Sequence, residues 1–207
     1  MKSQADILFC SSSPANADHL ELDREARTIQ RAIEDVDPEN TAPLRVMTRW
    51  AAEPLDLLRE IRAVRPTVLH FAGYGARGTE IGIYLRDPIS GEAKLVGAQA
   101  LKATIQAAGS SIRIVVFSAC YTEVQAAGLL EIETLNCVIG INSAISETDI
   151  REFAHEFYCA LAGGRSVYDA WRRGNQPLEM RGIPEHHCPQ LRERPGSDAR
   201  RVFVCHG

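Results

Sequence analysis

The sequence predicts an α/β fold, a three-layer sandwich in which helices cover both faces of a mostly parallel central sheet. Short apolar runs alternate along the chain with segments whose apolar residues recur at helical spacing. Residues 67–71 and 112–118 are almost continuously apolar, which is typical of parallel strands buried on both faces. A β, α, β, α, β order in a chain of 207 residues implies parallel strands joined by right-handed crossovers.

Prolines and turn-forming residues separate the expected elements. Pro54 is a favourable first residue for a helix, and Pro66 ends it. The turn at residues 87–91 separates two short runs that we expect to form a β-hairpin. The expected strands are residues 5–10, 44–48, 67–71, 81–85, 94–96, 112–118 and 138–141, and the expected helices are residues 20–33, 54–64, 101–108, 124–130, 149–162 and 167–173.

Residues 1–175 are expected to form one domain, in which residues 138–141 close the regular sheet. Residues 176–207 form a C-terminal segment rich in Pro and Arg, with a possible last strand at residues 202–204. Five soft ligands lie near this end of the chain: His186, His187, Cys188, Cys205 and His206. Their spacing matches no familiar zinc pattern, so no metal is expected.

Composition excludes some classes of partner. A net charge of −4 and a pI near 5.9 give no general electrostatic reason to bind nucleic acid or an anionic membrane. No apolar run approaches the ~20 residues of a membrane span, and residues 1–6 lack the shape of a secretory signal. The six cysteines form no CxxC pair and are read as reduced thiols. A cytoplasmic location is therefore expected, and no cofactor.

The candidate for chemistry is Cys120, at the end of the apolar run at residues 112–118. Sites in α/β proteins lie outside the carboxyl ends of parallel strands. The run at residues 67–71 also ends in a loop, at Gly73 and Gly75, so the two strand ends are expected to frame one cleft.

Four blocks of the sequence resemble the CHAT domains, which belong with caspases, separase and other caspase-like cysteine peptidases. They run in the family's order across about residues 5 to 175 and fill most of the chain. Each block alone is weakly specific, but the ordered set is fairly specific. The blocks are Ile7-Leu8-Phe9 with Leu20-Glu21-Leu22-Asp23-Arg24-Glu25; His70-Phe71-Ala72-Gly73-Tyr74-Gly75; Val115-Val116-Phe117-Ser118-Ala119-Cys120; and Phe153 through Phe157-Tyr158, Leu161, Gly164 and Ala170.

The resemblance implies a caspase-like sandwich in which Cys120 attacks a peptide carbonyl. It implies that the backbone N–H groups of Gly75 and Cys120 form the oxyanion hole. The family's catalytic histidine directly precedes this glycine, and here that position is Tyr74. A phenol, whose pKa is ordinarily ~10, is a hydrogen-bond donor at neutral pH and cannot simply replace imidazole. Tyr74 is instead expected to fill the cleft or to bind the ligand.

Two further residues leave alternatives open. His70 is either a displaced base or a core histidine hydrogen-bonded to backbone, and the core role is favoured. Asp149 lies in a segment that lines the substrate pocket in relatives, where an acidic residue favours Arg or Lys. Its other interpretation, as the cap of the helix that follows, is favoured from the sequence.

Two functions follow from the resemblance. The first is a degenerate peptidase that acts as a regulatory or assembly module in a bacterial defence or cell-death system. The second is an active cysteine endopeptidase that uses Cys120 with His70 or with a base supplied by a partner. In both, the expected partner is a protein or peptide, such as a separately encoded sensor or relative. Tyr74 favours the degenerate peptidase.

Overall fold

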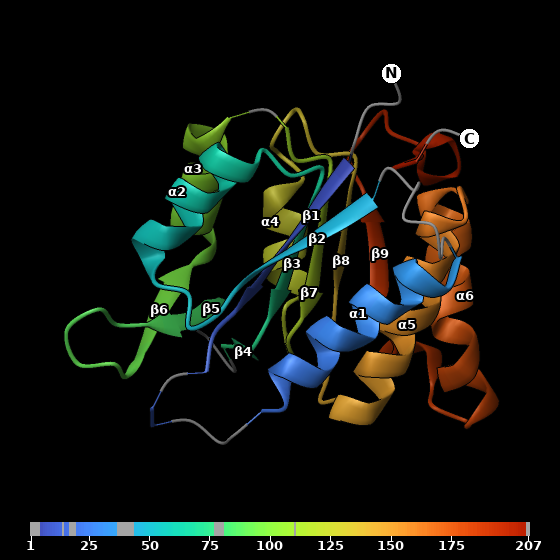
Figure 1. Cartoon of the computed structure of the whole chain (residues 1–207), viewed down its shortest axis with the longest axis horizontal. Coiled ribbons are helices and arrows are strands. Elements are labelled where there is room, and N and C mark those ends of the chain that lie inside the picture. The colour runs from blue at the N-terminus through green and yellow to red at the C-terminus, as the bar shows by residue number, and fades with distance from the viewer. Residues whose placement is uncertain are drawn as a thin grey trace.

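A six-stranded sheet with helices on both faces forms the centre of the protein (Figure 1). The computed structural model describes residues 5–13, 15–16, 20–36, 44–76, 81–109 and 111–205. The strands lie in the order β2-β1-β3-β7-β8-β9, and only β9 is antiparallel to its neighbour. Their bounds are β1 Ala5–Ser11, β2 Leu44–Arg49, β3 Val68–Ala72, β7 Ile114–Ser118, β8 Cys137–Gly140 and β9 Gln190–Glu193. The predicted α/β three-layer sandwich is therefore confirmed.

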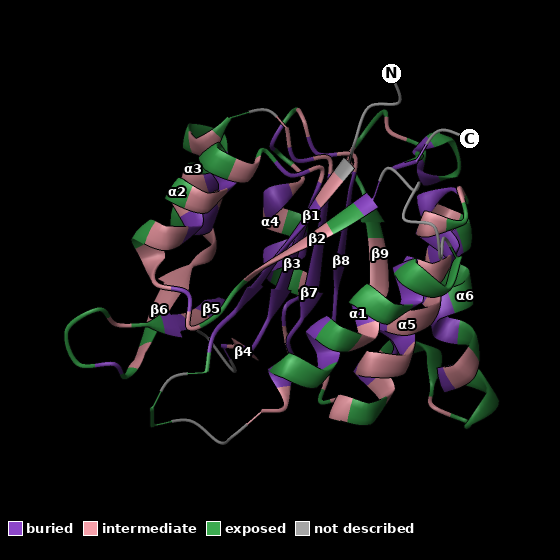
Figure 2. Ribbon diagram, in the orientation of Figure 1, coloured by how far each residue is buried: buried purple, intermediate pink, exposed green. Residues whose placement is uncertain are grey.

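Each face of the sheet packs against its own set of helices. The helices are α1 (Leu22–Val36), α2 (Pro54–Val64), α3 (Ala98–Ala108), α4 (Glu123–Leu129), α5 (Glu147–Ala162) and α6 (Val167–Met180). Ile7 and Phe9 of β1 face the core made with α1, α5 and α6, whereas Leu8 and Cys10 face the core made with α2, α3 and α4. Successive side chains of a strand point to opposite faces, so a continuous apolar run serves both cores. Figure 2 shows the buried residues concentrated along these strands.

The predicted hairpin forms the larger part of a second sheet. Strands β5 (Gly82–Arg86) and β6 (Ala93–Gly97) are antiparallel, and the short β4 (Tyr74–Gly75) pairs with β5. The Asp87 carboxylate accepts hydrogen bonds from the backbone N–H groups of Ile89 and Ser90 at 2.9 and 3.0 Å, which fixes the turn. These bonds lower the pKa of Asp87 to about 2. Because β4 belongs to this sheet, the hairpin places Gly75 beside the central sheet.

The C-terminal segment differs from the expectation in two places. Strand β9 pairs with β8, so the strand at Cys137–Gly140 does not close the sheet as predicted. The expected strand at residues 202–204 is not a strand. Helix α6 runs through residue 175, the end of the predicted main domain. Strand β9 lies at the edge of the sheet, where one side of the strand is not covered by a neighbour. Its sequence, QLRE, is polar and lacks the apolar signal of the inner strands.

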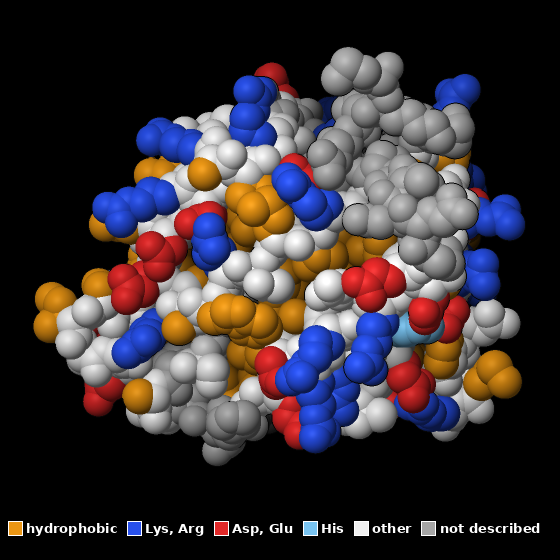
Figure 3. All heavy atoms as spheres, viewed as in Figure 1, with side chains coloured by type: hydrophobic (Ala, Val, Ile, Leu, Met, Phe, Trp, Pro, Cys, Tyr) orange, Lys and Arg blue, Asp and Glu red, His pale blue; other side chains and the backbone are white. Residues whose placement is uncertain are grey.

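Charged side chains of both signs cover α1 (Figure 3). Arg24 pairs with Glu21 at 2.7 Å, and Arg27 pairs with Asp23. Such exposed pairs contribute little to stability. No helix in the described ranges has the length and apolar character of a membrane span.

Candidate active site

The carboxyl ends of β3 and β7 lie side by side and carry the predicted site. Ala72 and Ser118 are partners in the parallel ladder, and the Gly73 N–H donates to the Ser118 carbonyl at 3.3 Å. Cys120 follows two residues after β7 and is partly exposed. The two strand ends thus frame one cleft, as the sequence predicts.

Gly75 packs directly against the backbone of Cys120. A Cβ atom on Gly75 would overlap the Cys120 carbonyl oxygen and would lie 3.0 Å from Cγ2 of Thr122. No residue larger than glycine fits this approach. The two residues whose N–H groups the resemblance assigns to an oxyanion hole are therefore in contact.

The turn after Cys120 is held in an uncommon conformation. Tyr121 has a φ of 61°, in the left-handed region that non-glycine residues seldom adopt. Thr122 fixes the turn, because its N–H donates to the Ile141 carbonyl at 2.6 Å and its Oγ1 accepts from the Ile141 N–H at 3.1 Å. Strain of this kind occurs at functional turns.

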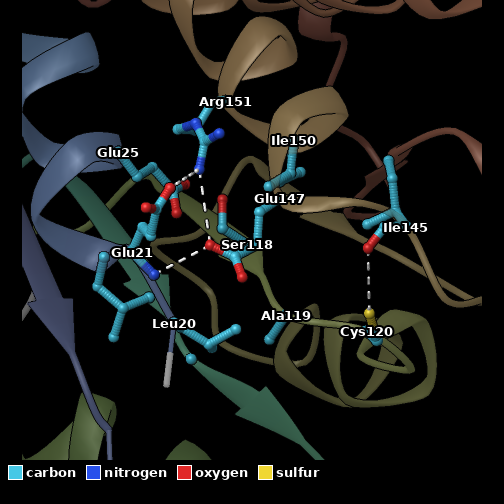
Figure 4. Close-up of a pocket in the computed structure, with 12 residues that line it drawn as sticks. Leu20, Glu21, Glu25, Ser118, Ala119, Cys120, Ile145, Glu147, Ile150 and Arg151 are labelled. Atoms are coloured by element: carbon cyan, nitrogen blue, oxygen red, sulfur yellow. Dashed lines mark hydrogen bonds and ion pairs between the residues drawn. The ribbon is translucent and has the colours of Figure 1, made fainter. Parts of the chain in front are cut away.

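A pocket of about 70 Å³ opens beside Cys120 (Figure 4). This volume is several times the ~10–15 Å³ that one water molecule needs, so the pocket has room for the end of a slender side chain. Its walls come from the ends of β3 and β7 and from the starts of α1 and α5. The lining residues are Leu20, Glu21, Leu22, Glu25, Gly73, Ser118, Ala119, Cys120, Ile145, Glu147, Ile150 and Arg151. The Cys120 thiol is oriented towards the Ile145 carbonyl at 4.0 Å.

The lining is acidic. Three carboxylates, those of Glu21, Glu25 and Glu147, face one guanidinium, that of Arg151. Arg151 pairs with Glu21 at 3.4 Å and with Glu147 at 3.6 Å. Glu147 also accepts a hydrogen bond from the backbone N–H of Glu21 at 2.9 Å, which joins the starts of α1 and α5. The pocket therefore carries an excess of negative charge and suits a cationic group.

His70 is buried in the core between the sheet and helices α1 and α5. Its Nδ1 lies 2.8 Å from the Tyr158 hydroxyl and its Nε2 lies 3.0 Å from Oε1 of Glu25. Its side chain is fully buried, and its ring stacks on Phe9 at 5.0 Å. The favoured core role thus fits, except that its partners are side chains rather than the expected backbone groups. With both nitrogens engaged, His70 is not placed to take a proton from Cys120.

Tyr74 occupies the position next to Gly75 that the resemblance assigns to the catalytic histidine. It lies in β4, pairs with Tyr84 of β5 and is partly exposed. Among the hydrogen bonds of the described chain, Cys120 Sγ has only the one to Ile145. The thiol therefore has no imidazole partner in this part of the structure.

Asp149 does not line the pocket. Helix α5 begins two residues earlier, with Ser146 as its N-cap, and the Ser146 hydroxyl accepts from the Asp149 N–H at 3.1 Å. The Asp149 carboxylate binds Arg181 at 2.6 Å. Asp149 thus supports the helix start without being the cap itself, and Glu147 is the acidic residue of α5 that reaches the pocket.

Glu25 is the site residue that the sequence pattern hides. Its position in α1 suggests the polar face, but its side chain is only 5% exposed. One signal points to it: His70, on an otherwise apolar strand, needs a polar partner from a covering helix.

Burial raises the pKa of four other thiols, those of Cys10, Cys137, Cys159 and Cys188. Burial, with a smaller contribution from the Glu60 carboxylate, raises the pKa of Cys10 to about 12. Burial also raises the pKa of Cys137 to about 12. Both stay protonated and unreactive at neutral pH. Within the described residues, no three His, Cys, Asp or Glu side chains gather as metal ligands would.

Comparisons with known proteins agree with this fold. A family model described as "CHAT domain" matches residues 3–188. The chain belongs to the CHAT domain family. Among curated proteins, no match was found.

Solved structures with the same fold include caspases and related proteases. The Drosophila initiator caspase Dronc is 7% identical to this CHAT domain, with a TM-score of 0.57 over 98% of this chain and 86% of that chain. A secreted C11 cysteine protease from Bacteroides thetaiotaomicron, solved with an irreversible peptide inhibitor, is 9% identical, with a TM-score of 0.61 over 92% of this chain and 66% of that chain. At such identities the likeness establishes the caspase-like fold alone.

Proposed function

We propose that this CHAT domain is a degenerate cysteine peptidase that binds a peptide segment in the pocket beside Cys120. Its role is regulation or assembly, in a bacterial defence or cell-death system, with a separately encoded sensor or relative as partner. The regulatory setting rests on the family resemblance. The binding role rests on the site.

One observation carries the proposal: the thiol is present without its base. Tyr74 stands in the histidine position, and His70 has both ring nitrogens bound to Tyr158 and Glu25. A thiol without a base has no group to take its proton and to protonate the leaving amine, and loss of general acid–base catalysis costs about 10²- to 10⁴-fold. Cys120 alone is therefore a poor catalyst, whereas binding does not depend on a base.

The peptide side chain that suits the pocket is basic. The pocket is narrow, and its three carboxylates outnumber the single guanidinium. We therefore keep the expected preference for Arg or Lys. The acidic residues that would provide it are Glu21, Glu25 and Glu147 rather than Asp149. Arginine suits such a pocket because its planar fork of donors matches carboxylate geometry.

The alternative function is an active endopeptidase whose base comes from a partner. It is favoured by the retained nucleophile position, since Cys120 is partly exposed and Gly75 packs against it. His70 is a poor choice of base, because it would have to leave two buried hydrogen bonds.

Peptide binding tests the proposal. We expect the Cys120→Ala protein to bind an acetylated tetrapeptide amide ending in arginine at least about tenfold more tightly than the same peptide ending in citrulline. Citrulline has nearly the same shape as arginine but no charge. Isothermal titration calorimetry or peptide-observed NMR measures both affinities, and the alanine variant excludes turnover during the titration.

A matched surface variant controls for general charge effects. Glu179 pairs with Arg172 at 3.3 Å and does not line the pocket, so Glu179→Gln should leave the preference for arginine unchanged. Equal binding of the arginine and citrulline peptides would contradict the proposed pocket.

A further inference from the structure

We propose that His70 and Tyr158 are positioning residues of the pocket, which hold the Glu25 carboxylate at its floor to receive the basic side chain of a bound peptide. This inference rests on the proposed function and assigns a role to the histidine that the site does not use as a base. It concerns three buried side chains, from β3, α5 and α1, which we call the Glu25 network.

Among the three carboxylates of the pocket, that of Glu25 has no Arg or Lys partner in the described part of the chain. Arg151 pairs with Glu21 and Glu147, and in the described part of the chain no Arg or Lys forms an ion pair with Glu25. The Glu25 side chain is 5% exposed, yet it lines the pocket. His70 serves one oxygen of this buried carboxylate, and the N–H donors of a ligand guanidinium could serve the other.

The network fixes the direction of the Glu25 carboxylate. Oε1 of Glu25 lies 3.0 Å from Nε2 of His70, so this oxygen is directed into the core. No hydrogen bond of the described chain uses Oε2, which leaves that oxygen for the pocket. Phe9 stacks on the His70 ring at an interplanar angle of 19°, which restricts rotation of the imidazole.

Tyr158 selects the tautomer of His70 that can serve Glu25. Burial, and then the charge of Glu25, raise the pKa of Tyr158 well above its usual value, so the phenol keeps its proton. The hydroxyl can therefore donate to Nδ1 of His70 at 2.8 Å, which places the ring proton on Nε2, facing the carboxylate. Without the hydroxyl, the other tautomer becomes available and turns a lone pair towards the Glu25 carboxylate.

A second polar group lines the same pocket. The Ser118 hydroxyl is buried, lines the pocket and has no hydrogen-bond partner in the described structure. A guanidinium presents several N–H donors in one plane, so it can serve Glu25 and Ser118 together. An orphan acceptor of this kind is explained when a ligand completes it.

The arginine-to-citrulline preference of the Cys120→Ala protein provides the test. Glu25→Gln should reduce the preference about tenfold, the effect of one opposite charge close to a ligand cation. Tyr158→Phe, which removes only the hydroxyl, should reduce it at least about threefold, and so should His70→Leu. His70→Gln should retain it, because the glutamine amide nitrogen can donate from nearly the place of Nε2.

Circular dichroism and thermal unfolding show which variants are folded. A purely structural role for His70 would predict equal effects of leucine and glutamine, so loss with leucine and retention with glutamine support positioning. If His70→Leu does not fold, the comparison of Tyr158→Phe with His70→Gln carries the test. An unchanged preference in folded Tyr158→Phe overturns the inference. Absence of any preference in the Cys120→Ala parent would instead contradict the proposed function.

Discussion

Tyr74→His is expected to raise Cys120-dependent peptide cleavage by about 10²- to 10⁴-fold, the usual contribution of a positioned general acid or base. The reason is local. Tyr74 directly precedes Gly75, and Gly75 packs against the Cys120 backbone, so we expect an imidazole at residue 74 to reach the thiol. It can deprotonate Cys120 and later protonate the leaving amine. Cleavage of a fluorogenic peptide library with Arg and Lys measures the gain.

Three variants control this result. The double variant Tyr74→His, Cys120→Ala should show no gain in peptide cleavage, because it lacks the nucleophile. Tyr74→Phe should remain as inactive as the unmodified protein, because it supplies no base. Tyr84→His places an imidazole on the neighbouring strand, opposite residue 74, and should give a much smaller gain. If Tyr74→His is folded but cleaves peptides no faster than the unmodified protein, then the missing histidine is not the sole reason for low activity.

Gly75→Ala is expected to destabilise the protein by about 2–3 kcal/mol, as an overpacked contact does. The new methyl group would overlap the Cys120 carbonyl oxygen, and a backbone atom cannot rotate out of the way. The turn that carries Cys120 must then separate from β4. Urea unfolding measures the loss of stability, and arginine-peptide binding should weaken with it.

Gly128→Ala is the matched control for Gly75→Ala. Gly128 lies inside α4, and an added methyl group meets no atom of the described structure within 4 Å. Alanine is favoured over glycine in a helix interior by up to about 1 kcal/mol, so stability should hold or rise. Equal effects of the two substitutions would contradict the close approach of Gly75 to Cys120.

The sequence pattern predicted those parts of the fold whose signal is local. The continuous apolar run at Ile114–Ser118 predicts an inner strand, and the turn at residues 87–91 predicts a hairpin. Both are present. Strand β9 was not predicted, because its sequence QLRE has no apolar pattern. Its partner β8 also lies far from it in the sequence. Edge strands are defined by their neighbour more than by their own residues.

The same distinction explains the site. Gly75 and Cys120 each follow a recognisable strand end, so their meeting could be predicted from the parallel sheet. The Glu25 network could not, because His70 meets partners 45 and 88 residues away in the sequence. A histidine on an apolar strand shows that a polar partner is needed, but not which helix supplies it. For the same reason the sequence offers Asp149 as a possible acidic residue of the pocket, beside its favoured interpretation as a helix cap, and does not point to Glu25 or Glu147.

Turnover by the unmodified protein tests the central claim, that Cys120 is a nucleophile position without a catalytic base. The measurement compares hydrolysis of the Arg- and Lys-containing peptide library by the unmodified protein and by Cys120→Ala, at equal concentration and near pH 7. The account predicts that the two rates are indistinguishable, while Tyr74→His exceeds both. Substantial turnover by the unmodified protein that is abolished in Cys120→Ala would contradict it.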